Sequence, residues 1–167
     1  IKNIKIDTKT NDQLTDITLN VNEDKKTGNI LLAGTFNADT GAGLTFGIED
    51  KNIFGSGNSI RSNFSINSED LKFDINYVQY PIINPYLTNT YTLFNQDNDY
   101  TDSFGFKASR RGFGYFINFK QNENVSYGLG LNYETFKGHS GVNASSNAIR
   151  DNIGNFENYK LRFSLNF

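Results

Sequence analysis

Apolar and polar residues alternate strictly along most of this chain, in segments of about nine residues. In one such segment, Ala42, Leu44, Phe46 and Ile48 alternate with Gly43, Thr45, Gly47 and Glu49. Because successive side chains of a strand point to opposite faces, each segment has one apolar face and one face rich in polar residues and glycine. Repeated along the chain, this pattern predicts an all-β protein, an antiparallel transmembrane β-barrel whose apolar face meets lipid.

From residue 27 onward the pattern predicts about eight strands joined by turns. The expected strands cover about 29–37, 42–49, 57–67, 71–80, 87–96, 104–119, 125–134 and 159–167. The polar segments 97–99 and 137–156 are expected to be loops. Pro81 and Pro85 bracket a bend between the fourth and fifth strands, because proline cannot donate a hydrogen bond within a sheet.

The sixth predicted strand changes its parity. Phe106 and Ala108 occupy even positions, whereas Phe113 and Tyr115 occupy odd ones. A slip of one residue would move every side chain to the opposite face. We therefore expect a bulge at 110–112 within an extended strand, with a turn between two separate strands as the alternative.

Residues 1–26 differ from the rest because they lack aromatic side chains and end in a charged run, 23–26. Two short alternating segments, 4–6 and 17–21, indicate a soluble β-hairpin. We interpret it as the end of a small periplasmic-type domain, and two further barrel strands are the alternative. The predicted domains are thus 1–26 and 27–167.

The composition agrees with strands that cross a membrane. Only 37% of the 167 residues are hydrophobic, the mean hydropathy is -0.54, and no run of eighteen apolar residues occurs, so the sequence predicts no transmembrane helix. A barrel strand needs only every second residue to be apolar. The 15 Phe, 9 Tyr and 15 Gly fit interfacial aromatic girdles and a lumen face where glycine relieves crowding.

Several functional classes are disfavoured by the residues that are missing. There is no cysteine, so neither disulfides nor thiolate chemistry is expected, and a net charge of -2 provides no basic field for nucleic acid. The chain begins at Ile1 without a signal-peptide pattern, which indicates either processing or a piece of a longer polypeptide. We expect no cofactor and no metal.

A catalytic site is not expected either. His139 is the only histidine and lies in the polar segment 137–156. Serine and acidic residues are plentiful nearby, so a Ser-His-Asp set is formally possible, but a solvated loop histidine is the favoured interpretation. The sequence therefore predicts a protein that is not an enzyme.

Two further charged clusters have simpler interpretations. Asp97, Asp99 and Asp102 form only a weak calcium signal and are expected to keep their loop hydrated. Lys107 and the Arg110-Arg111 pair are expected to line the lumen, and contact with acidic lipid headgroups is the alternative.

Three short motifs resemble, in the right order, the BamA family of outer-membrane assembly factors, a bacterial surface antigen barrel family. The segment 21–28 resembles the junction between the last POTRA domain and the barrel, 52–57 resembles the family's turn between its second and third strands, and 84–87 resembles the turn after its fourth strand. The residues that carry the turn motifs are Thr27, Gly28, Asn52, Gly55, Gly57, Asn84, Pro85 and Tyr86.

One family signature has no counterpart. The Val-Arg-Gly-Phe loop of the second half of the barrel is absent from this chain. The segment 111–113 reads Arg-Gly-Phe, but it belongs to the predicted sixth strand and follows Arg110 rather than valine. The signature's role is therefore not assigned to it.

The resemblance implies the end of the last POTRA domain followed by the first half of a barrel of about sixteen strands. It places the protein in the bacterial outer membrane, with the N-terminal residues in the periplasm. The first barrel strand would be a seam strand that binds substrate strands through Ile30, Leu32, Gly34, Thr35 and Phe36. The implied partners are outer-membrane lipid, unfolded outer-membrane barrel proteins and, through upstream domains, accessory lipoproteins, with no nucleic acid.

The expected function is assembly and insertion of outer-membrane barrel proteins through a lateral seam at the first strand. Two alternatives stay open. An aromatic row that ends in Phe167 is also typical of a complete small eight-stranded barrel, either structural or a passive channel. A polypeptide transporter of the same broader family would share the barrel.

Overall fold

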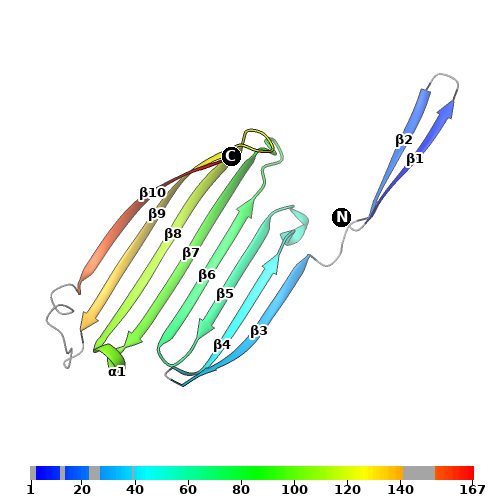
Figure 1. Ribbon diagram of the computed structural model, residues 1–167. Helices are drawn as coiled ribbons and strands as arrows, with labels where there is room; N and C mark the ends of the chain where they lie inside the picture. The colour runs from blue at the N-terminus through cyan, green and yellow to red at the C-terminus, as the bar shows by residue number, and fades with distance from the viewer. Residues whose placement is uncertain (1–2, 12–13, 23–26, 39, 141–152) are drawn as a thin grey trace.

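The computed structural model describes residues 3–11, 14–22, 27–38, 40–140 and 153–167. Apart from two short helical turns, its regular elements are strands, and they form two separate sheets (Figure 1). In the part of the chain described, no helix is long and apolar enough to cross a membrane.

The smaller sheet is an N-terminal hairpin. Its strands β1 (Asn3–Asn11) and β2 (Leu14–Asn22) pair with each other and with no strand of the larger sheet. The hairpin therefore does not contribute two further strands to the barrel wall. The charged run 23–26 lies outside the described residues.

The larger sheet contains eight strands in sequential order, each antiparallel to the next. They are β3 (Gly28–Asn37), β4 (Gly41–Asp50), β5 (Ser59–Ile66), β6 (Asp70–Gln79), β7 (Leu87–Tyr100), β8 (Phe106–Lys120), β9 (Ser126–Ser140) and β10 (Asn155–Asn166). The short helices are η1 (Ile53–Gly55), after β4, and α1 (Thr101–Phe104), after β7. The predicted all-β, antiparallel fold with eight barrel strands is confirmed.

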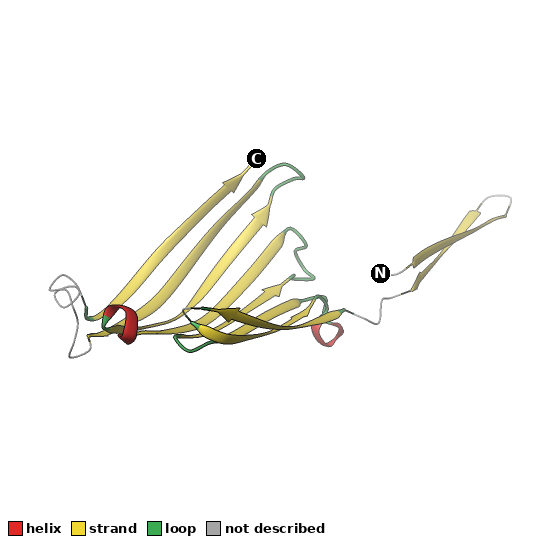
Figure 2. Ribbon diagram, turned by 60° about the horizontal axis from the view of Figure 1, so that its bottom comes forward, coloured by secondary structure: helices red, strands yellow, loops and turns green. Residues whose placement is uncertain are grey.

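The sheet is curved but open. Figure 2 shows the strands bending together as a section of a barrel wall would. Its two edges are β3 and β10, and no hydrogen-bonded pairing joins them within the described residues. Within the described residues the sheet is therefore an open, curved wall and not a closed barrel.

The two faces of the sheet have opposite chemistry. We call the face that carries the apolar rows the outer face; one row on it runs from Ile75 through Leu93 and Phe113 to Tyr133. The opposite, inner face carries mostly polar residues and glycine. No hydrophobic residue is buried among those described, and Leu93, Leu131 and Phe163 are 50%, 45% and 76% exposed. Because a single sheet encloses no core, its outer face needs an apolar solvent to cover it.

Each strand also has two distinct ends. We call the end that carries Gly28 and the connections 51–58, 80–86 and 121–125 the near end. The opposite end, with the connections 67–69 and 101–105, is the far end.

Two sequence-based expectations about β7 and β8 are wrong. Residues 97–99 are not a loop, because β7 continues to Tyr100 and Asp97 pairs with Ser109. Residues 110–112 form neither a bulge nor a turn, since β8 keeps one register with both neighbours throughout. The parity change arises because the outer face of β8 turns from apolar to polar toward the far end, while Phe106 lies on the inner face.

The predicted loop 137–156 is also shorter than expected. Strand β9 extends to Ser140 and β10 begins at Asn155, so both ends of that segment are strand. Residues 141–152 lie outside the described part of the chain. Polar composition indicated a loop here, but pairing with β8 keeps β9 extended as far as Ser140, which lies opposite Phe106.

Candidate functional site

The first strand of the large sheet is its edge. Strand β3 pairs with β4 from Gly28↔Asp50 to Asn37↔Gly41, and no described strand lies on its other side. An edge strand presents a row of N–H and C=O groups without backbone partners. In a membrane such groups need partners, because lipid tails supply none.

The five predicted seam residues divide between the two faces of β3. Ile30, Leu32 and Phe36 lie on the outer face and are 74%, 75% and 84% exposed. Ile48 and Phe46, which lie opposite Ile30 and Leu32 on β4, are each only 41% exposed. Gly34 lies on the same face, and a Cβ built on it would meet no atom within 4 Å. The side chains of this stretch therefore contribute little to holding the edge in place.

Thr35, the fifth predicted residue, lies on the inner face. Its partner across the ladder is Gly43, and a Cβ on Gly43 would come within 2.7 Å of Thr35 Oγ1. The glycine thus makes room for the threonine, a contact that the alternating pattern alone does not reveal. Thr35 thus packs over Gly43 of β4, although it remains an exposed residue.

At the near end, the motif that begins at Asn52 builds a tight connection from β4 to β5. Asn52 Oδ1 accepts a hydrogen bond of 2.6 Å from the Gly57 N–H, and its own N–H donates to Asp50 Oδ1 at 2.9 Å. Gly55 and Gly57 have φ angles of 71° and 76°, which favour glycine. Phe54 also has a positive φ, 54°, although it is not a glycine, and it is 98% exposed. The motif residues therefore serve the turn itself.

The second near-end motif closes the connection from β6 to β7. Asn84 accepts from the Tyr86 N–H through Oδ1 at 3.1 Å and from the Leu87 N–H through its carbonyl at 3.1 Å. The Tyr86 carbonyl accepts from the Lys120 N–H at 2.8 Å. Pro85 lies inside this turn, where its missing N–H costs no sheet hydrogen bond.

The junction between the hairpin and the sheet begins the ladder of β3. The carbonyl of Thr27 accepts a hydrogen bond of 3.0 Å from the Lys51 N–H, one residue beyond the Gly28↔Asp50 pair. The first hydrogen bond at the near end of the edge strand thus comes from the predicted Thr-Gly motif.

An ionic cluster that the sequence did not reveal lies on the inner face of β8, β9 and β10. Glu134 is only 8% exposed; its Oε2 pairs with Arg110 at 2.8 Å, and its Oε1 pairs with Lys160 at 2.7 Å. Asn158 also donates to Oε1 at 3.2 Å. Alternation alone could have placed all four side chains on the inner face, but only the register brings them together.

The three basic residues predicted to line the lumen all belong to β8 and divide between the two faces of the sheet. Arg110 lies on the inner face, whereas Lys107 and Arg111 lie on the outer face, so the lumen assignment is wrong for these two. The cause is the alternation of a continuous strand, which sends neighbouring residues to opposite faces.

Of the remaining sequence candidates, Asp102 lies in the short helix α1 and the others lie on strands. Asp97 and Asp99 belong to β7, and His139 belongs to β9, where its side chain is exposed. Asp97 accepts from Asn95 Nδ2 at 2.8 Å, and Asp99 pairs with Lys107. In the described part of the chain, no group of three or more acidic, histidine or cysteine side chains is arranged to hold a metal ion.

A curved antiparallel sheet with an apolar outer face, a polar inner face and an open edge defines the wall of an outer-membrane type of β-barrel. The family comparison names that class. The Omp85 superfamily domain matches residues 52–167, more than half of the chain, and the chain belongs to the Omp85 superfamily.

Solved structures share the fold. One is the crystal structure of BamA from Haemophilus ducreyi lacking POTRA domains 1-3, with a TM-score of 0.64 and 21% sequence identity. The match covers 98% of this chain and 34% of that one, so this chain spans only part of the related protein's length. A search of curated proteins gave no match. The predicted resemblance to a BamA-type barrel is thus confirmed.

Proposed function

We propose that this chain is the N-terminal part of the barrel of an outer-membrane assembly factor, which inserts other barrel proteins through a seam at β3. The observation that carries the proposal is the edge position of β3 in a member of the Omp85 superfamily. The role is one of binding and templating rather than of catalysis.

The mechanism follows from the hydrogen-bonding needs of a strand in lipid. An unfolded strand entering the membrane must satisfy its backbone groups before it meets hydrocarbon. The open edge of β3 offers matching N–H and C=O groups, so an incoming strand can add to it by β-augmentation. Gly34 contributes no side chain near the middle of this edge strand, and the space beside it is open.

The location and partners follow from the same proposal. The outer face would contact the lipid of the bacterial outer membrane, and the near end, with the β1–β2 hairpin, would lie in the periplasm. We propose that the hairpin is the end of a POTRA-like domain. Accessory lipoproteins would bind upstream domains, while unfolded barrel proteins would bind the β3 edge.

A disulfide across the seam tests the proposal. In the complete natural protein, Leu31→Cys on the inner face of β3 would be combined with cysteines scanned along the last barrel strand. The variant that crosslinks fully should lose at least about tenfold of its assembly activity on a barrel substrate in proteoliposomes, and a reductant should restore it. Unchanged assembly by the locked protein would exclude insertion through this edge.

A matched crosslink controls for the disulfide itself. Thr45 and Ser65 are partners in the β4–β5 ladder. Thr45→Cys with Ser65→Cys should therefore crosslink strands that are already paired and leave assembly intact. A polypeptide transporter of the same superfamily would move its substrate through the lumen, so persistent transport with a locked seam would favour that alternative.

A further inference from the structure

The outer face has a second region, at the far end, that the proposed function does not use. Strands β7, β8 and β9 have 14, 15 and 15 residues, whereas a tilted transmembrane strand needs about 9–11. On these three strands the apolar band ends before the far end, and charged side chains continue the same face. The extra residues therefore lie beyond the hydrocarbon.

A row of aromatic rings marks where the hydrocarbon ends. Ring centroids lie 5.9 Å apart between Phe113 and Tyr133, and 5.1 Å apart between Tyr133 and Tyr159. Aromatic girdles of barrels lie at the level of the lipid headgroups. The next outer position on β8 beyond this row is Arg111, which pairs with Thr135. Arg111 is thus about 7 Å farther along the strand, at headgroup depth.

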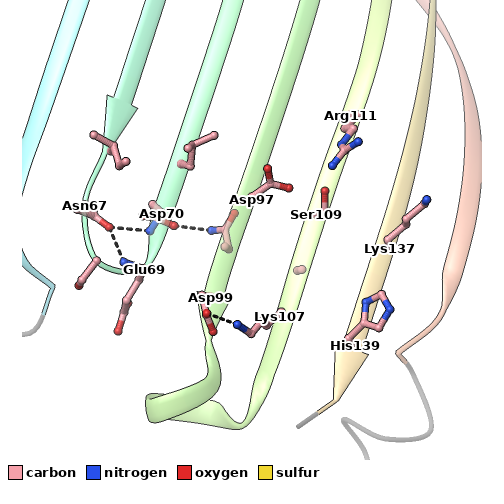
Figure 3. A pocket seen from close by; sticks show the side chains of 15 residues that line it. Asn67, Glu69, Asp70, Asp97, Asp99, Lys107, Ser109, Arg111, Lys137 and His139 are labelled. Carbon is pink, nitrogen blue, oxygen red and sulfur yellow. Dashed lines mark hydrogen bonds and ion pairs between the residues drawn. The ribbon is translucent and has the colours of Figure 1, made fainter.

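The charged side chains beyond the aromatic row line a hollow of about 490 Å³ (Figure 3). Its acidic residues come from the connection 67–69, β6 and β7, and its basic residues from β8 and β9. Three of the acidic groups have identified donors. Asp97 accepts from Asn95 and Ser109, Asp99 from Lys107, and Asp70 from Lys72 at 3.0 Å.

Two of the basic side chains lack such a partner. Among the described residues, none of the ion pairs includes Arg111 or Lys137, although Arg111 is attracted by Asp97 at longer range. Arg111 pairs with Thr135, and Lys137 with Ser109, so the two cations are diagonal neighbours on adjacent strands. Such neighbours are about 7–8 Å apart, a spacing at which two long side chains can reach one anion.

We propose that Arg111 and Lys137 bind the phosphate of a lipid headgroup. The arginine fork suits two phosphate oxygens, and the lysine supplies a second charge. A lipid fits better than a soluble anion, because the site continues the lipid-facing surface directly beyond the aromatic row. The lipid's chains would then lie on Phe113 and Tyr133.

The test measures lipid binding to the complete protein in detergent micelles. Diphosphorylated lipid A is titrated in, and bound lipid is counted by native mass spectrometry. R111Q/K137Q should weaken binding at least about tenfold, because two charge-assisted contacts are lost. The matched control R61Q/K120Q removes one arginine and one lysine from the inner face toward the near end and should change binding less than about twofold.

Two further arms separate the explanations. R111K/K137R keeps both charges and should retain binding within about threefold, with the same heat-dependent gel shift as the natural protein. Lipid A stripped of its phosphates should bind as weakly to the natural protein as intact lipid A binds to R111Q/K137Q. Equal binding of the stripped lipid, equal loss in the control, or displacement of lipid A by an equal concentration of inorganic phosphate would overturn the proposal.

Discussion

The edge of the sheet at β3–β5 and the long strands β7–β9 are built from the same alternating pattern but differ in their contacts. The β4–β5 ladder has seven residue pairs, whereas the β7–β8 and β8–β9 ladders have fourteen and fifteen. The long strands add pairs of tilted aromatic rings and the Arg110–Glu134 ion pair, while β3 exposes its outer side chains. Opening the sheet at the proposed β3 seam would therefore break fewer side-chain contacts than opening it between β7 and β9.

The largest difference is expected in backbone protection. Amide protons of β3 that point away from β4 should exchange at least about 100-fold faster than those of β8, because opening the edge breaks few side-chain contacts. Hydrogen exchange with mass spectrometry on the complete protein compares peptides covering 28–37 and 106–120. Equal protection of the two peptides would mean that β3 is held as firmly as β8 and would remove the basis for an opening seam.

A smaller difference is expected between two ion pairs. Glu134→Ala removes the acceptor of Arg110 and Lys160 and should lower the free energy of unfolding by about 2 kcal/mol. At the edge, Glu49→Ala removes a 2.9 Å pair with Arg61, whose side chain is 60% exposed, and should cost about 0.5 kcal/mol. Urea unfolding in detergent or lipid measures both free energies of unfolding. Similar losses would show that the ion pairs of Glu134 stabilise the sheet no more than the Glu49–Arg61 pair does.

A third difference is expected between two glycines. A Cβ on Gly130 would come within 2.6 Å of Phe116 Cδ2, and the Arg162 guanidinium lies 5.3 Å from that ring's centre on the inner face. Gly130→Ala should therefore destabilise the protein by about 1–2 kcal/mol. Gly34→Ala meets open space and should be neutral or stabilising by up to about 1 kcal/mol. The same unfolding measurement applies, and a reversed order would contradict the packing described here.

The site was only partly predictable from the sequence. The alternating pattern placed Ile30, Leu32 and Phe36 on one face, because side-chain direction depends only on position along a strand. It could not show that Thr35 packs over Gly43, since that contact depends on which residues of β4 lie opposite. The unpaired side of β3 is likewise a property of the whole sheet.

The sequence by itself determined the strands, their two unlike faces and the turn chemistry of Asn52 and Asn84, because these follow from local periodicity and local hydrogen bonds. The tertiary structure decided which residues lie opposite one another on neighbouring strands and which distant charges meet. Glu134 contacts Arg110 and Lys160, which are 24 and 26 residues away. Register sets such contacts, and it is fixed only when neighbouring strands pair.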